Sequence, residues 1–133
     1  MPEPPSERAS FDYAVIRVVP RVEREEFVNA GVILFCPERK FLGVRVQMDE
    51  GRLRALCPAI DADEVRQHLT ALTRIAAGEY DAGPIARLSQ RERFHWLAAP
   101  RSTIIQVSPV HTGVCDDPED NMNRLFAALV DRA

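Results

Sequence analysis

The stretch Val28-Asn-Ala-Gly-Val-Ile-Leu-Phe35 decides the fold, because it is almost continuously apolar and rich in β-branched side chains. A run of this kind is typical of a strand that is covered on both faces of its sheet. Gly31 interrupts the run, and an isolated glycine within a strand indicates a bulge or a close approach of another segment. The sequence therefore predicts a buried strand over residues 28–35 that is irregular near Gly31.

Two more strand patterns flank this stretch. Residues 11–19 alternate between two faces, with Ala14, Ile16 and Val18 on one of them, and Pro20 ends the pattern. Residues 41–48 alternate apolar and polar side chains, which indicates a strand with one face in water. The connections between the three strands are short, so we expect an antiparallel meander.

Helix signals follow the three strands. Residues 49–56 have the pattern of a short helix. Asp61 and Glu64 form a capping pair for a longer helix that Gly78 ends. The apolar side chains of that longer helix recur at helical spacing: Val65, Leu69, Leu72 and Ile75. Residues 81–90 are expected to form a loop, and residues 91–100 a helical turn that runs into a loop.

One more strand and one more helix complete the pattern. Residues 102–108 predict a fourth strand, and Asp117 caps a last helix that starts at Pro118. The order β-β-β-α-β-α predicts an α+β fold, with a mostly antiparallel sheet of about four strands and helices packed on one face. Residues 1–9 are polar and rich in proline, so we expect a disordered tail before a single α+β domain over residues 10–133.

Composition and charge narrow the class of protein. The chain has 133 residues and a formal net charge of −3, which disfavours nucleic acid as a partner because dedicated nucleic-acid binders carry a basic excess. No apolar stretch is long enough to cross a membrane, and the N-terminus lacks the pattern of a signal peptide. The three cysteines are widely spaced, which is typical of a reduced, cytoplasmic protein. We expect no cofactor.

Two segments, residues 20–31 and 91–113, combine arginine with asparagine, histidine, glycine or proline near predicted strand ends. One interpretation is an anion site, in which guanidinium and imidazole groups converge on a phosphate or carboxylate: Arg21, Arg24, Arg93, Arg101, His95 and His111. The other is a network of surface salt bridges between these arginines and acids of the same segments: Glu23, Glu25, Glu26 and Glu92.

Other chemistries have weaker patterns. No metal site is expected, because no pair of cysteines or histidines has the spacing of a structural zinc site. Candidate nucleophiles with His111 as their base lack the local motifs of hydrolases and cysteine proteases: Cys57, Cys115, Ser102 and Ser108. Trp96, with Phe94 and Leu97, could form a binding face, although a lone tryptophan is more often buried in the core.

The two arginine-rich segments also carry a set of residues that resembles a known family. In the first segment the set is Arg17, Pro20, Arg21, Glu23, Arg24, Glu26, Phe27, Asn29, Gly31 and Val32. In the second it is Arg93, Phe94, Trp96, Leu97, Ala99, Pro100, Arg101, Ser102, Gln106, Ser108, Pro109, His111 and Gly113. From Tyr13 onward the chain is similar to a bacterial family known as domain-of-unknown-function family 3037. It departs from that family at Glu25, where a glycine is common. Either the turn there differs, or Glu25 is strained.

The resemblance implies no catalytic residue. It implies an accessory role, because such proteins tend to be encoded beside kinase-like proteins that resemble the HipA toxin. Two hypotheses follow: a non-enzymatic module that docks on a partner such as a HipA-like kinase, and a small enzyme or sensor for a phosphate-bearing or acidic ligand. The candidate binding residues are Arg21, Arg24, Glu26, Asn29, Arg93, Trp96, Arg101 and His111. A pocket of arginines would favour a ligand, whereas arginines paired with glutamates beside an apolar patch would favour docking.

Overall fold

Five strands form one antiparallel sheet in the computed structural model, which describes residues 8–101 and 103–131. The strands are β1 (Ala9–Val18), β2 (Val28–Cys36), β3 (Phe41–Val46), β4 (Ile105–Val107) and β5 (His111–Cys115). Their order is β3-β2-β1-β4, and β5 pairs with the N-terminal half of β1. The predicted α+β class and antiparallel meander are confirmed.

Four α-helices lie within the described residues, three of them at the predicted places. They are α1 (Glu50–Leu56), α2 (Ala62–Ala76), α3 (Gln90–Leu97) and α4 (Pro118–Leu129). The side chain of Asp61 accepts from the backbone N–H of Glu64, and that of Asp117 accepts from Glu119 and Asp120, so the predicted N-caps are confirmed. Three residues of the expected fourth strand, Ile105–Val107, are extended, and Ser102 lies outside the described residues.

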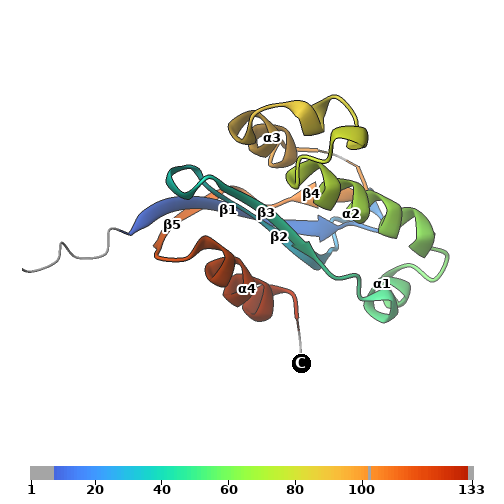
Figure 1. Cartoon of the computed structure of the whole chain (residues 1–133). Helices are drawn as coiled ribbons and strands as arrows, with labels where there is room; N and C mark the ends of the chain where they lie inside the picture. The colour runs from blue at the N-terminus through green and yellow to red at the C-terminus, as the bar shows by residue number, and fades with distance from the viewer. Residues whose placement is uncertain (1–7, 102, 132–133) are drawn as a thin grey trace, which may run out of the picture.

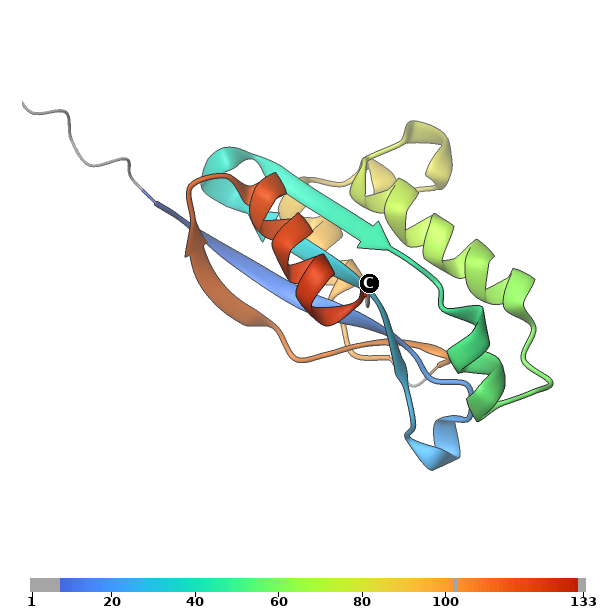
Figure 2. The ribbon, with the colours of Figure 1, turned by 90° about the horizontal axis from the view of Figure 1, so that it is seen from below.

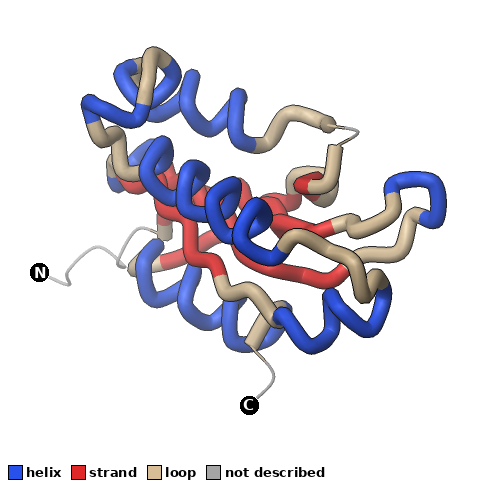
Figure 3. The backbone as a smooth tube through the Cα atoms, turned by 90° about the vertical axis from the view of Figure 1, so that its right-hand side faces the viewer, coloured by secondary structure: helices blue, strands red, loops and turns tan. Residues whose placement is uncertain are grey.

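Helices cover both faces of the sheet, which corrects the expectation that they pack on one face. Figures 1 and 3 show α2 and α3 on one side of the strands and α4 on the other. Ile33 and Phe35 of β2 belong to the core under α2 and α3, whereas Val32 and Leu34 belong to the core under α4. The physical reason is the uninterrupted apolar run of β2, which exposes hydrophobic surface on both faces.

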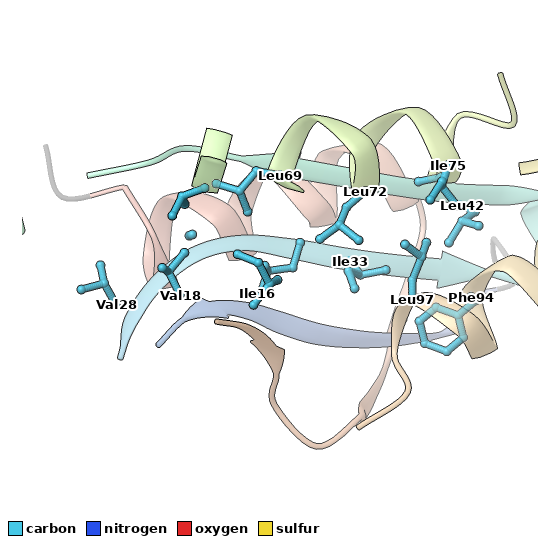
Figure 4. Close-up of a cluster of buried hydrophobic side chains, with 14 of the residues drawn as sticks. Ile16, Val18, Val28, Ile33, Leu42, Leu69, Leu72, Ile75, Phe94 and Leu97 are labelled. Atoms are coloured by element: carbon cyan, nitrogen blue, oxygen red, sulfur yellow. The ribbon is translucent and has the colours of Figure 1, made fainter. Parts of the chain in front are cut away.

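The larger core lies between the sheet and α2 and α3. Figure 4 shows Ile16 and Ile33 of the sheet opposite Leu69 and Leu72 of α2. At one end of this core the ring of Phe35 stacks on that of Phe94 in α3, with 5.2 Å between the ring centroids.

The smaller core lies under α4, which packs on β2 and β3. Figure 2 shows α4 across this face of the sheet with β5 beside it. The polar side chains of β3 were expected in water, and one of them, Arg45, also lies over the Phe126 ring of α4, 4.3 Å from its centroid. Arg45 also donates to Asn123 of α4 over 2.7 Å, yet Arg45 and Gln47 are both exposed, so the polar side chains of this strand lie in water as expected, with Arg45 at the edge of α4.

A β-bulge interrupts the pairing of β1 with β2. Ile16 pairs with Gly31 and Arg17 with Asn29, so Ala30 is the extra residue. A Cβ atom on Gly31 would lie 2.7 Å from the carbonyl oxygen of Arg45, which is closer than packed atoms approach. Both expectations for Gly31, a bulge and a close approach, are therefore confirmed.

The chain differs from the sequence expectations at three further points. Residues 90–97 form a complete helix, opened by a capping box between Ser89, inside the expected loop, and Glu92, inside the expected helical turn. Residues 111–115 form a strand that was not expected. The first strand begins at Ala9, which is fully buried, so the sheet starts inside the expected tail; residues 1–7 of that tail lie outside the described residues. None of the described helices is both long enough and apolar enough to cross a membrane.

Candidate functional site

The predicted arginines do not converge on one point. Arg24 forms an exposed ion pair with Glu26 in the connection between β1 and β2, as the salt-bridge interpretation expected. Arg93 donates to the carbonyl oxygens of Leu88 and Ala76, over 2.7 and 3.4 Å, and thereby joins α3 to the end of α2. Arg21 is exposed at the start of a 3-10 turn, Val22–Arg24. Each of the three has a different environment.

Glu25 completes that turn in the left-handed backbone conformation, with φ 57°. Its N–H donates to the carbonyl of Val22 and closes the turn. The turn thus has the left-handed conformation that suits the glycine expected from the family resemblance. Glu25 is strained in this conformation. The connection presents Val22 and Phe27 as exposed apolar side chains.

Among the predicted arginines, Arg101 is held both by hydrogen bonds and by contact with an aromatic ring. It donates to the carbonyl oxygens of Trp96 and Leu97 over 2.7 and 2.9 Å, at the C-terminal end of α3. Its guanidinium lies 4.6 Å from the Trp96 ring centroid. Burial lowers the pKa of Arg101 from its ordinary value, although an arginine remains charged at any physiological pH.

Arg101 separates two hollows of the surface. The first, the Arg17 pocket, has a volume of about 420 Å³ and lies beside the β1–β2 connection. Its lining residues are Arg17, Val19, Val22, Glu25, Phe27, Arg101 and Gln106. The second, the Trp96 groove, has a volume of about 480 Å³ between α2 and the segment from α3 to β4. Its walls include Leu72, Ile75, Trp96, Ile104 and Ile105.

Arg17 was not singled out as a binding residue by sequence reasoning, yet it forms the centre of the first hollow. Its guanidinium lies 4.2 Å from the centroid of the Phe27 ring, and its Nε is buried without a hydrogen-bond partner. Arg17 and Gln106 are paired neighbours on β1 and β4. The available signal was an arginine inside the apolar run of residues 14–19, because a charged side chain among buried apolar neighbours needs a polar partner.

Trp96 is half exposed, whereas Phe94 and Leu97 of the same helix are buried in the larger core. Phe94 and Leu97 are therefore core residues, whereas Trp96 is not. Its exposed fraction of 39% leaves the indole as one edge of the Trp96 groove.

The remaining predicted binding residues lie elsewhere. His111 is exposed on β5, with its ring centroid 5.2 Å from that of Tyr13. His95 lines a separate hollow of about 400 Å³ with Arg91 and Asp12. Asn29 donates to the carbonyl of Leu129 over 3.1 Å at the end of α4, and its Oδ1 is buried without a partner. None of these side chains lines the Arg17 pocket or the Trp96 groove.

Two of the candidate nucleophiles, Ser108 and Cys115, are engaged in the packed structure. The Ser108 hydroxyl accepts from the backbone N–H of Val15 over 2.8 Å and donates to the carbonyl of Pro109 over 2.9 Å. Cys115 is buried, and this burial together with the neighbouring Cys36 thiol raises its pKa. A raised pKa disfavours the thiolate that nucleophilic attack requires.

Within residues 8–101 and 103–131, no three histidine, cysteine or carboxylate side chains are grouped so that they could hold a metal ion. No curated protein matches the chain, and no solved structure matches it. The family described as protein of unknown function (DUF3037) matches residues 13–130, which is nearly the whole chain and includes both hollows. The chain belongs to this family, DUF3037.

Proposed function

We propose that this protein is a non-enzymatic accessory module of the cytoplasm, which binds a partner protein through the Trp96 groove. The observation that carries the proposal is the half-exposed Trp96 beside an apolar groove whose other walls are helix α2 and strand β4. Tryptophan and arginine are the residues that most often dominate the binding energy of an interface, and here Trp96 and Arg101 are stacked on one another.

The groove is preorganised for an apolar side chain of a partner. Leu72 and Ile75 come from α2, and Ile105 comes from β4, so two elements of one core hold the walls. The Trp96 carbonyl accepts from Arg101, which fixes the end of α3 at the rim. A rigid apolar groove costs little ordering entropy on binding, which favours docking of a preformed segment.

The charges differ between the two rims of the groove. Arg101 lies at one rim, and Glu64 and His68 of α2, 3.7 Å apart, lie at the other. The Arg101 rim favours a partner segment that carries a carboxylate beside its apolar anchor. The occupant that we propose is a segment of a HipA-like kinase. The gene neighbourhood implied by the family resemblance supports this partner.

The test is direct binding of the purified protein to a HipA-like kinase of the same genome, measured by calorimetry. Trp96→Ala is expected to weaken binding at least tenfold, which corresponds to about 1.4 kcal/mol. The matched control is Tyr80→Ala, since Tyr80 is the most exposed aromatic outside the groove and also stacks on an arginine, Arg87. Tyr80→Ala is expected to bind like the original protein.

Two results would contradict the proposal. Failure of the unaltered protein to bind the kinase would exclude this partner. If Trp96→Ala and Tyr80→Ala weaken kinase binding equally, or if neither variant weakens it, the Trp96 groove is not the docking surface.

A further inference from the structure

We propose that the Arg17 pocket binds the carboxylate of a small acid with a compact apolar body. The pocket is separate from the Trp96 groove, and only Arg101 lines both. It lies where the β1–β2 connection meets β4, and its lining combines two guanidinium groups with an amide and three apolar side chains: Arg17, Arg101, Gln106, Val19, Val22 and Phe27.

Arg17 is held in place but left without an acceptor. Its Nε is buried and has no hydrogen-bond partner, and the ion pairs among the described residues do not include it. The Phe27 ring fixes the plane of its guanidinium from 4.2 Å. A guanidinium presents five N–H donors in a fixed fork that matches a carboxylate. The Nη groups of Arg17 also have no acceptor among the described residues, so they are the donors that an acceptor from outside the chain can reach.

Arg101 supplies a second guanidinium at the same pocket. It donates from Nη1 to Leu97 and from Nη2 to Trp96, which orients it and still leaves three of its five N–H groups for another acceptor. Gln106, paired with Arg17 across β1 and β4, donates from Nε2 to the Thr103 carbonyl over 2.9 Å, and the second N–H of that amide can donate beside the guanidinium. The polar groups are thus prepositioned by backbone pairing, stacking and helix carbonyls, as a binding site requires.

The walls and volume define the rest of the ligand. Val19 is buried, whereas Val22 and Phe27 are exposed apolar side chains on the rim. A volume of about 420 Å³ falls within the range of small-molecule sites, which runs from roughly 300 to 1,000 Å³. The ligand therefore has one carboxylate and a compact apolar body.

Glu25 is the acid among the lining residues, and it distinguishes two sources of such a carboxylate. A plain carboxylic acid would be repelled by a carboxylate at the rim, whereas the ammonium of an α-amino acid would be attracted by it. Isocaproate and leucine share the same branched skeleton and differ by this ammonium group. Comparison of the two identifies which source the pocket takes.

The experiment is an NMR titration of the ¹⁵N-labelled protein that follows the Nε–Hε signals of its arginines. Isocaproate and leucine are the probes, and isocaproamide is the neutral control. We expect a saturable shift of the Arg17 signal with at least one acid and none with the amide. Tighter binding of leucine identifies amino acids as the source, and tighter binding of isocaproate identifies plain acids.

Matched variants assign the binding to the pocket. Arg17→Met is expected to weaken acid binding at least tenfold, whereas Arg21→Met, which removes an exposed arginine of the same connection, stays within about twofold. Arg17→Lys keeps the charge without the fork and is expected to lose most of the affinity. Melting temperatures of all three variants separate a binding defect from a folding defect.

The proposal is overturned if the amide binds as well as the acids, if neither acid gives a saturable shift at its solubility limit, or if Arg21→Met loses as much affinity as Arg17→Met. The comparison of acids with the amide needs no variant, so it decides the question even if Arg17→Met does not fold. Arg17 does not line the Trp96 groove, so Arg17→Met is expected to leave kinase binding unchanged.

Discussion

At the scale of single residues, two non-glycine residues have a left-handed backbone conformation that glycine adopts more easily. Glu25 and Lys40 have φ values of 57° and 51°, and each N–H closes a 3-10 turn between neighbouring strands. A non-glycine residue in this conformation costs roughly 1–2 kcal/mol. Glu25 lines the Arg17 pocket, so the strained residue places a carboxylate at the pocket that a glycine would lack.

Replacement of Glu25 by glycine is therefore expected to stabilise the protein. Relief of the left-handed strain is offset in part by the greater freedom of glycine in the unfolded chain, so we expect the free energy of unfolding to rise by about 0.5 kcal/mol. Urea denaturation measures this change. The control is Glu23→Gly, within the 3-10 turn Val22–Arg24, which is expected to lower the free energy of unfolding by roughly 0.5–1 kcal/mol. An equal loss in both variants would contradict the argument.

At the scale of elements, residues that begin and end helices carried most of the predictable information. Asp61 and Asp117 marked the starts of α2 and α4, because a side-chain acceptor at that position satisfies free backbone N–H groups. The same signal existed for α3 in Ser89 and Glu92, but Ser89 fell in a stretch that was interpreted as a loop, so the start of the helix was missed. β5 was missed because its segment, His111–Cys115, is short and its pairing with β1 depends on residues far away in the sequence.

Gly31 shows how one glycine allows two strands, β2 and β3, to approach each other closely. A Cβ atom at Gly31 would meet the backbone oxygen of Arg45, which cannot rotate away as a side chain could. We expect Gly31→Ala to lower the free energy of unfolding by about 1–3 kcal/mol, as overpacking of a core does. Gly51→Ala is the control, since Gly51 lies in helix α1 where the nearest atom is 3.6 Å away. That variant is expected to gain roughly 0.5–1 kcal/mol in urea denaturation. A harmless Gly31→Ala would mean that β2 and β3 can separate without cost.

At the scale of the whole molecule, the fold class was readable from the sequence, whereas the layering and the candidate site were not. The apolar run of β2 indicated two covered faces, which the two cores confirm, and the alternation in β3 indicated a wet face, where Arg45 is exposed although it contacts Phe126 of α4. The arginines failed to converge because Arg24 and Arg93 find partners close by in the chain or in a neighbouring helix. Arg17 became central through its lack of an internal partner, a property that depends on the packed fold and that no spacing in the sequence encodes.

Cys115 of the smaller core makes the free energy of unfolding depend on pH in the alkaline range. Burial first, and then the Cys36 thiol, raises the pKa of Cys115, with Asp116 acting in the same direction and Arg39 against it. A thiol whose pKa is higher in the folded state keeps its proton where the unfolded chain releases it. Its contribution to stability is full below the unfolded pKa of about 8.5, and it is lost as pH rises from there toward the folded value.

We therefore expect the free energy of unfolding to fall more steeply above about pH 8.5 in the unaltered protein than in Cys115→Ala. Each unit by which the folded pKa exceeds the unfolded one corresponds to about 1.4 kcal/mol of this loss. Urea denaturation at a series of pH values, under reducing conditions, measures both curves. Below pH 8 the two proteins should differ by a constant amount, which reports only the loss of packing and serves as the internal control. Parallel curves over the whole range would show that Cys115 ionises as easily in the folded protein as in the unfolded chain.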